Sequence, residues 1–183
     1  MIKTKLEWTI WMVTIALLGS GWILVSRSPK TEPRTISLTE APIVGHLAPN
    51  FTLQTPDGET IALAEKLAEG QPVVLNFWAS WCGPCRVEIP FFQNASLKYK
   101  NRVAIIGINQ GESEETVVDF GQQFNITYPL LYDPDDQVNQ SYLVKSLPTT
   151  VFVSSDGIVQ EIVIGSMSQA VLEERIERLV NNQ

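Results

Sequence analysis

The segment of residues 73–90 constrains the fold more than any other part of the chain. It begins with an apolar run, Val73 to Trp78, that is rich in Val, Leu and Phe and predicts a buried strand. Cys82 and Cys85 follow with Cys-x-x-Cys spacing and are the only cysteines in the sequence. A helix with apolar positions is expected after them. The two cysteines are therefore predicted where a strand leads into the N-terminus of a helix.

This position favours the anionic form of a cysteine, because the first backbone N–H groups of a helix lack partners and the helix dipole is positive there. The thiolate is the reactive form of cysteine, so Cys82 is the predicted nucleophile. Cys85, one turn deeper, is the predicted resolving cysteine, which releases a mixed disulfide. Pro84 falls in the first turn, where its missing N–H costs nothing. Three-residue spacing also brings the two sulfurs close enough to form a bond.

The sequence Trp-Cys-Gly-Pro-Cys at Trp81 to Cys85 resembles the active site of the thioredoxin superfamily. More narrowly, the chain is similar to the membrane-anchored TlpA/ResA type of thiol-disulfide oxidoreductase. The features that carry this similarity are Glu88, Pro90, the opening Val44 to Phe51, and Leu147 to Thr150. The resemblance implies an α/β thioredoxin fold, in which helices flank a mixed central β-sheet.

Local patterns predict elements that fit this fold. They include an N-terminal β-hairpin, and the resemblance adds a central insertion over residues 111–142. Alternating apolar residues and turn signals mark the strands, and Ser113 is a predicted helix N-cap. The expected elements are a hairpin with its turn at 56–58, a helical turn at 65–69, the active-site helix at 84–99, strands at 103–108 and 128–131, a helix from 114 to about 124, a short helix ending near 143, a hairpin of 149–153 with 158–164, and a closing helix around Leu172, Ile176 and Leu179.

Glu88 is a candidate proton acceptor for Cys85. It lies three residues after Cys85, so the two side chains share one helix face. Asn76 stands where ordinary thioredoxins have a buried acid, and because an amide does not titrate, Glu88 would take that role. The alternative interpretation is a solvated helix acid.

The resemblance also implies a substrate-binding surface. Pro148 matches the family's cis-proline loop opposite the cysteines, and Leu147 would offer backbone groups to a bound peptide. The alternative is an ordinary turn proline. Trp81, Gly83 and Pro84 complete the predicted surface, with Trp81 over the site and Trp78 in the core.

The N-terminal region predicts a single transmembrane helix before the domain. Residues 8–25 carry no formal charge over eighteen positions, and tryptophans lie near both ends. Roughly 20 residues span the hydrocarbon core. The alternatives are a cleaved signal peptide and a buried core helix. We therefore expect a tail at 1–7, an anchor in the bilayer at 8–25, a Pro-containing linker at 26–42 and a thioredoxin-like domain at 43–183.

The distribution of Lys and Arg around the apolar segment does not support the membrane orientation that the resemblance implies. Two lysines precede the apolar segment, and Arg27, Lys30 and Arg34 follow it, so the positive-inside rule does not favour an outside C-terminus. The resemblance implies a single-pass protein of the cell membrane whose catalytic domain lies on the extracytoplasmic (periplasmic) side.

Composition excludes some classes of partner and site. Residues 36–183 carry eight Lys or Arg and eighteen Asp or Glu, a net charge of −10, which argues against nucleic-acid binding. A zinc site normally needs four ligands. The only histidine, His46, lies 36 residues before Cys82, so no metal site is expected. No cofactor is expected beyond the redox-active Cys82–Cys85 pair.

The predicted function is reduction of disulfides in protein substrates, with a membrane protein as electron donor. In the resembling family, apocytochrome c thiols are a known target. One alternative is a binding or metal-delivery module, but copper-delivery relatives need wider cysteine spacing and a placed histidine. Another is a thiol peroxidase, since residues 44–51 are shared with peroxiredoxins. Ser80 could serve such an enzyme, but the proline it requires is absent from residues 73–81.

Overall fold

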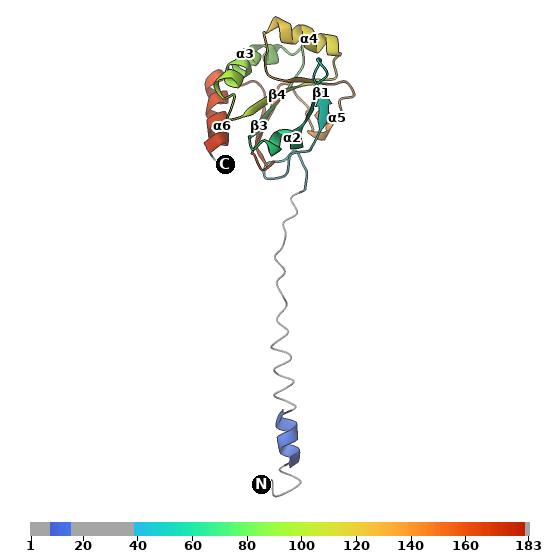
Figure 1. Ribbon diagram of the computed structural model, residues 1–183, viewed down its shortest axis with the longest axis vertical. Helices are drawn as coiled ribbons and strands as arrows, with labels where there is room; N and C mark the ends of the chain where they lie inside the picture. Colours follow the sequence, from blue (N-terminus) through green and yellow to red (C-terminus); the bar gives the residue numbers. More distant parts are fainter. Residues whose placement is uncertain (1–7, 16–38, 182–183) are drawn as a thin grey trace. The chain divides into compact units, whose positions relative to one another are not determined.

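The structure is a computed structural model that describes residues 8–15 and 39–181. The described residues fall into two units, one with residues 8–15 and the other with residues 39–181. In the first unit, residues 8–15 form a helix with exposed apolar side chains, among them Trp8 and Trp11 (blue in Figure 1). Within the described residues, no helix combines the length and apolar character needed to cross a membrane. The remainder of the predicted anchor and most of the predicted linker lie outside the described residues.

The described part of the second unit is built on one mixed sheet with the strand order β2-β1-β5-β4-β3-β6-β7. Its strands are β1 (Thr52–Gln54), β2 (Thr60–Ala62), β3 (Val73–Trp78), β4 (Ala104–Gln110), β5 (Leu130–Asp133), β6 (Thr149–Val153) and β7 (Val159–Ile164). Its helices are α2 (Leu63–Ala68), α3 (Gly83–Lys98), α4 (Glu114–Gln123), α5 (Gln137–Ser141) and α6 (Gln169–Asn181).

Strand β3 lies inside the sheet, parallel to β4 on one side and antiparallel to β6 on the other. All six of its residues are buried, which confirms the buried strand expected from the apolar run. Successive side chains of a strand point to opposite faces. Accordingly, Val74 and Trp78 belong to one core cluster, and Val73, Leu75 and Phe77 belong to the other.

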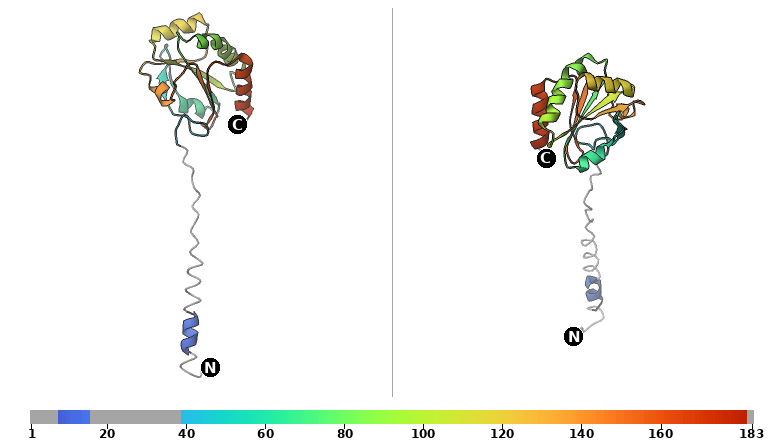
Figure 2. Two further views of the ribbon diagram at one scale, coloured as in Figure 1. Left: turned by 180° about the vertical axis from the view of Figure 1, so that it is seen from behind. Right: turned by 45° about the horizontal axis from the view of Figure 1, so that its top comes forward.

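Helices α3 and α6 cover the first face of the sheet and lie side by side (green and red in Figures 1 and 2). Ile89 and Phe92 of α3 and Leu172 and Ile176 of α6 are buried together with Val74 and Trp78 in one apolar cluster. The i, i+3 and i+4 spacing of these residues gives each helix one apolar face, as the sequence predicted.

The second face is covered by α2, α5 and the segment that precedes β1. Phe51, Leu63, Val138 and Tyr142 contribute to this core, and the Tyr142 hydroxyl donates a hydrogen bond to the Pro49 carbonyl at 2.7 Å. Both faces of the sheet are therefore covered, in agreement with the expected α/β architecture.

The predicted N-terminal hairpin forms between β1 and β2, and the C-terminal hairpin forms between β6 and β7. Ser113 caps α4 by accepting a hydrogen bond from the Thr116 N–H. One strand was placed wrongly. It was expected at residues 128–131 and is observed at Leu130–Asp133. Pro129 has no N–H to donate, so the ladder with β4 starts at the next residue.

Candidate active site

Cys82 and Cys85 form a disulfide bond where β3 leads into α3, with their Cα atoms 5.3 Å apart. Cys82 is the N-cap residue of α3, and its sulfur accepts a hydrogen bond from the Cys85 N–H at 3.2 Å. The side chain of Cys82 is 4% exposed, whereas that of Cys85 is 0% exposed. Of the two sulfurs, Cys82 is thus the one that solvent and a substrate can reach.

The loop that carries Cys82 begins at the buried end of β3. Trp78 is fully buried and stacks on Phe120 with their ring centroids 4.2 Å apart, while the Cys82 N–H donates to the Ala79 carbonyl. Trp81, by contrast, is 70% exposed. The two tryptophans that flank this loop therefore separate into a core residue and a surface residue next to the nucleophile.

Glu88 is enclosed in the core one turn after Cys85, with 0% of its surface exposed. Its Oε1 accepts a hydrogen bond from Asn76 Nδ2 at 2.8 Å, and its Oε2 accepts one from the Met167 N–H at 3.1 Å. Burial raises the pKa of Glu88 from 4.5 to about 7, against the lowering effect of these two donors. Glu88 is therefore not a solvated helix acid.

Asn76 connects Glu88 to the neighbouring strand. Its Nδ2 also donates to Thr150 Oγ1 at 3.3 Å, because Asn76 of β3 stands opposite Thr150 of β6. Its Oδ1 is buried and has no hydrogen-bond partner among the described residues. A side-chain amide offers donors on one side and an acceptor on the other. If the amide turned, Oδ1 would accept a hydrogen bond from the O–H group of neutral Glu88.

The Leu147–Pro148 peptide bond is cis, as the resemblance implied. Thr149, the next residue, stands opposite Phe77 of β3, so Pro148 lies at the edge of the sheet from which β3 continues to Cys82. The Pro148 carbonyl accepts a hydrogen bond from the Gly165 N–H at 2.8 Å, and Leu147 is half-buried against the core. Gly83 and Pro84 are exposed in the first turn of α3. The register thus brings the predicted substrate-binding residues to one edge of the sheet.

A polar cluster beside this loop was not predicted from the sequence. The carboxylate of Glu112 accepts hydrogen bonds from the Ser80 N–H at 2.7 Å, from Ser80 Oγ at 2.6 Å and from Asn109 Nδ2 at 2.7 Å. A signal existed, because Ser80 and Glu112 each follow one of two neighbouring buried strands. Parallel strands end at the same edge of a sheet, so polar residues after them meet.

Among residues 8–15 and 39–181, no group of three or more His, Cys, Asp or Glu side chains could hold a metal ion. His46 lies in the loop before β1, and its backbone carbonyl accepts a hydrogen bond from the Val159 N–H at 2.9 Å.

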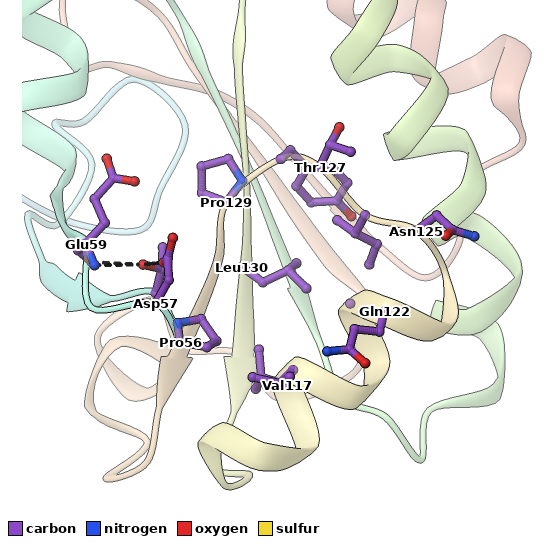
Figure 3. A pocket seen from close by; sticks show the side chains of 14 residues that line it. Pro56, Asp57, Glu59, Val117, Gln122, Asn125, Thr127, Pro129 and Leu130 are labelled. Atoms are coloured by element: carbon purple, nitrogen blue, oxygen red, sulfur yellow. Dashed lines mark hydrogen bonds between the residues drawn. The ribbon is translucent and has the colours of Figure 1, made fainter.

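A hollow of about 630 Å³ lies between the β1–β2 turn, α4 and the segment before β5 (Figure 3). Its lining includes Pro56, Glu59, Gln122, Asn125 and Pro129, and it contains neither cysteine nor Glu88. The redox-active pair is therefore separate from this cavity. Cys82 lies next to the exposed residues Trp81, Gly83 and Pro84, which suits contact with a protein substrate rather than with an enclosed small molecule.

Comparison with known proteins agrees with this geometry. Residues 44–162 match the family model described as the AhpC/TSA family. The chain is 33% identical over 175 residues to the thioredoxin-like protein YneN of Bacillus subtilis, covering 93% of this chain and 97% of that protein. It is 36% identical over 131 residues to the thiol-disulfide oxidoreductase ResA of the same organism, covering 71% of this chain and 72% of ResA.

Solved structures with a similar fold include thiol:disulfide interchange proteins as well. A crystal structure of a thiol:disulfide interchange protein of the thioredoxin family from Chlorobium tepidum superposes with a TM-score of 0.66 at 26% identity, covering 73% of this chain and 95% of that one. This match confirms the thioredoxin-like fold.

Proposed function

Because the chain belongs to the AhpC/TSA family, and within it to the ResA-type thiol-disulfide oxidoreductases, we propose that it reduces disulfides in protein substrates outside the cytoplasm while held at a membrane. The single observation that carries the proposal is the Cys82–Cys85 disulfide at the N-terminus of α3, with the buried carboxylate of Glu88 one turn further on.

In the first step, the thiolate of reduced Cys82 attacks one sulfur of a substrate disulfide. A new S–S bond forms between Cys82 and that sulfur, and the other substrate sulfur leaves as a thiolate that takes a proton from water. The Cys85 N–H, 3.2 Å from the Cys82 sulfur, and the positive end of the helix stabilise the attacking thiolate.

In the second step, Cys85 gives its proton to Glu88 and attacks the Cys82 sulfur. The bond to the substrate breaks, the second substrate sulfur leaves and is protonated, and the Cys82–Cys85 disulfide forms. Two electrons pass from the dithiol to the substrate. The pKa of Glu88, about 7, lies close enough to that of a thiol, about 8.5, for proton transfer near neutral pH.

The proposed substrate class is the disulfide that the two haem-binding cysteines of apocytochrome c form, which must be reduced to thiols before haem attachment. Support for this comes from the resemblance to the ResA type and from the exposed residues beside Cys82, which are Trp81, Gly83 and Pro84 and which a protein segment can contact. The proposed electron donor is a membrane protein that reduces the Cys82–Cys85 disulfide after each turnover.

The proposed membrane attachment uses residues 8–25 as an uncleaved anchor, with the domain on the extracytoplasmic side. It is supported by the charge-free sequence of this segment and by the exposed apolar side chains of the helix at residues 8–15. An apolar surface of that kind requires a lipid or protein environment.

The equilibrium of the Cys82–Cys85 pair with glutathione tests the proposed direction of transfer. A reductase predicts a potential near that of thioredoxin, about −270 mV, and a potential near that of DsbA, about −120 mV, would overturn it.

The family match also favours a second candidate function, thiol peroxidase. Ser80 Oγ, which such an enzyme would direct to its cysteine, instead donates to Glu112. We expect the reduced protein to reduce insulin disulfides and to consume hydrogen peroxide no faster than a free thiol. Rapid peroxide consumption without insulin reduction would favour the peroxidase.

A further inference from the structure

The loop from Ala79 to Cys82 joins β3 to α3 and carries the attacking sulfur, so its conformation decides where that sulfur lies. Ser80 is the residue of this loop with the most polar contacts. Both its N–H and its hydroxyl donate to the carboxylate of Glu112, at 2.7 and 2.6 Å. Hydrogen bonds to a charged acceptor are shorter and stronger than those between neutral groups. Glu112 is therefore a firm attachment point for the loop.

The carboxylate of Glu112 is itself fixed to the sheet. Asn109, fully buried at the end of β4, donates from Nδ2 to Oε2 of Glu112 at 2.7 Å and accepts from the Glu112 N–H at 3.0 Å. The Asn109 carbonyl in turn accepts from Asn139 Nδ2 of α5 at 3.2 Å. The acceptor that Ser80 contacts is thus held at the position set by β4.

The other peptide group of Ser80 is also held. Its carbonyl accepts a hydrogen bond from Arg86 at 3.3 Å, and the Arg86 guanidinium lies over the rings of Phe124 and Phe120, 5.0 and 5.6 Å from their centroids. Among the described residues, Glu112 and Arg86 are the charged side chains hydrogen-bonded to this loop. Glu88 lies in the core, one turn along α3.

We propose that Glu112 is a positioning residue for the reaction at Cys82: through Ser80 it keeps Cys82 at the N-cap of α3 after the disulfide has been reduced. This inference rests on the proposed role of Cys82 as nucleophile. In the oxidised protein the bond to Cys85 fixes the Cys82 sulfur. In the reduced protein that bond is gone. The sulfur then stays against the Cys85 N–H only while this loop and the hydrogen bond from the Arg86 N–H to the Cys82 carbonyl, 3.2 Å long, keep the Cys82 backbone in place.

Glu112→Gln separates this proposal from a simple charge effect, because the two predict opposite signs. Removing a negative charge near Cys82 would favour its thiolate and make it more acidic. Loss of positioning has the opposite result. A glutamine has one acceptor oxygen for the three donors that face Glu112, so the loop is released and the Cys82 thiolate loses its contact with the Cys85 N–H.

The experiment follows alkylation of Cys82 by iodoacetamide from pH 4 to 10 in the reduced full-length protein, with the modified residue identified by mass spectrometry. In Glu112→Gln we expect the midpoint of the pH profile to rise by about one unit, and the rate at pH 7 to fall about tenfold, the loss expected for one hydrogen bond to a charged group. Glu114→Gln, an exposed acid in the first turn of α4, is the matched control and should leave the profile unchanged.

A second variant tests the route through Ser80. Ser80→Ala should also raise the midpoint, and the double variant should change it no more than Glu112→Gln alone. Fully additive shifts would show that Glu112 acts elsewhere. An unchanged or lowered midpoint in Glu112→Gln, with or without a loss of stability to denaturant, would overturn the proposal. Alkylation needs no protein substrate, so this outcome is distinct from failure of the reductase assay.

Discussion

Glu88→Gln should remove a pH dependence of stability that the wild-type protein carries between about pH 4.5 and 7. In the folded protein, burial raises the pKa of Glu88 to about 7, whereas in the unfolded chain the carboxyl has its ordinary pKa of 4.5. The folded state therefore binds the proton more tightly, and the free energy of unfolding falls as the pH rises through this range. A difference of about 2.5 units at about 1.4 kcal/mol each amounts to roughly 3.5 kcal/mol.

The assay is denaturant unfolding of the oxidised wild type and the variant at pH 5 and pH 8. Oxidised cysteines do not titrate, and other groups contribute equally to both proteins. Near pH 5 a neutral Glu88 and a glutamine are close in shape and charge, and the unpartnered Asn76 Oδ1 can accept from either. Between pH 5 and 8, the wild type should lose about 2.5 kcal/mol more stability than the variant.

The control is Glu115→Gln, an exposed acid in the first turn of α4, which should follow the wild-type curve. If wild type and Glu88→Gln lost stability in parallel from pH 5 to 8, the pKa of Glu88 would be ordinary. Its proposed role as proton acceptor for Cys85 would then lose its physical basis.

Three further predictions concern kinetics, packing and location. In stopped-flow reduction of a peptide disulfide, Glu88→Gln should keep the first attack by Cys82 and slow release of the mixed disulfide about 10²-fold; an unchanged release rate would count against the role. Gly107→Ala should destabilise the protein by about 2 kcal/mol in denaturant unfolding, because the added Cβ would lie 2.6 Å from the Leu130 side chain; wild-type stability would show that the leucine yields freely. The intact chain should stay with membranes in alkaline carbonate, and recovery of a soluble form that starts near residue 20 would show cleavage instead.

The sequence was informative wherever a feature is local. The apolar run from Val73 to Trp78 became β3 with the same bounds, and the cysteine motif lies at the strand–helix junction, because both depend on neighbouring residues only. The three-residue spacing from Cys85 to Glu88 likewise placed the carboxylate on the buried face of α3. These parts of the fold and of the candidate site could be predicted without coordinates.

The hydrogen bonds that join distant segments around the site were not predicted. Ser80 and Glu112 are 32 residues apart, and the Met167 N–H that holds Glu88 is 79 residues from it, so no periodicity connects them. The donor from Met167 is a backbone group, which every residue except proline carries, so side-chain identity gives no signal. The paired ends of β3 and β4 were the only available indication for the Glu112 cluster.

The misplaced strand shows a different limit. Tyr128 is aromatic and comes shortly before two leucines, a pattern that predicts a strand. In the structure it is buried in the core cluster that contains Val74 and Trp78, and it precedes the first residue of β5 that pairs with β4. Pro129 then interrupts the row of N–H donors. At the other end, Asp133 is a poor strand former by propensity. It ends β5 because its carboxylate accepts hydrogen bonds from three backbone N–H groups at the start of α5.

The most direct test of the central claim is to trap the covalent intermediate. Reduced Cys85→Ser, mixed with a peptide disulfide and quenched with acid, should accumulate a mixed disulfide that mass spectrometry maps to Cys82. Reduced Cys82→Ser should accumulate none, because its remaining thiol is fully buried. A mixed disulfide at Cys85 in Cys82→Ser, or none in Cys85→Ser, would contradict the account.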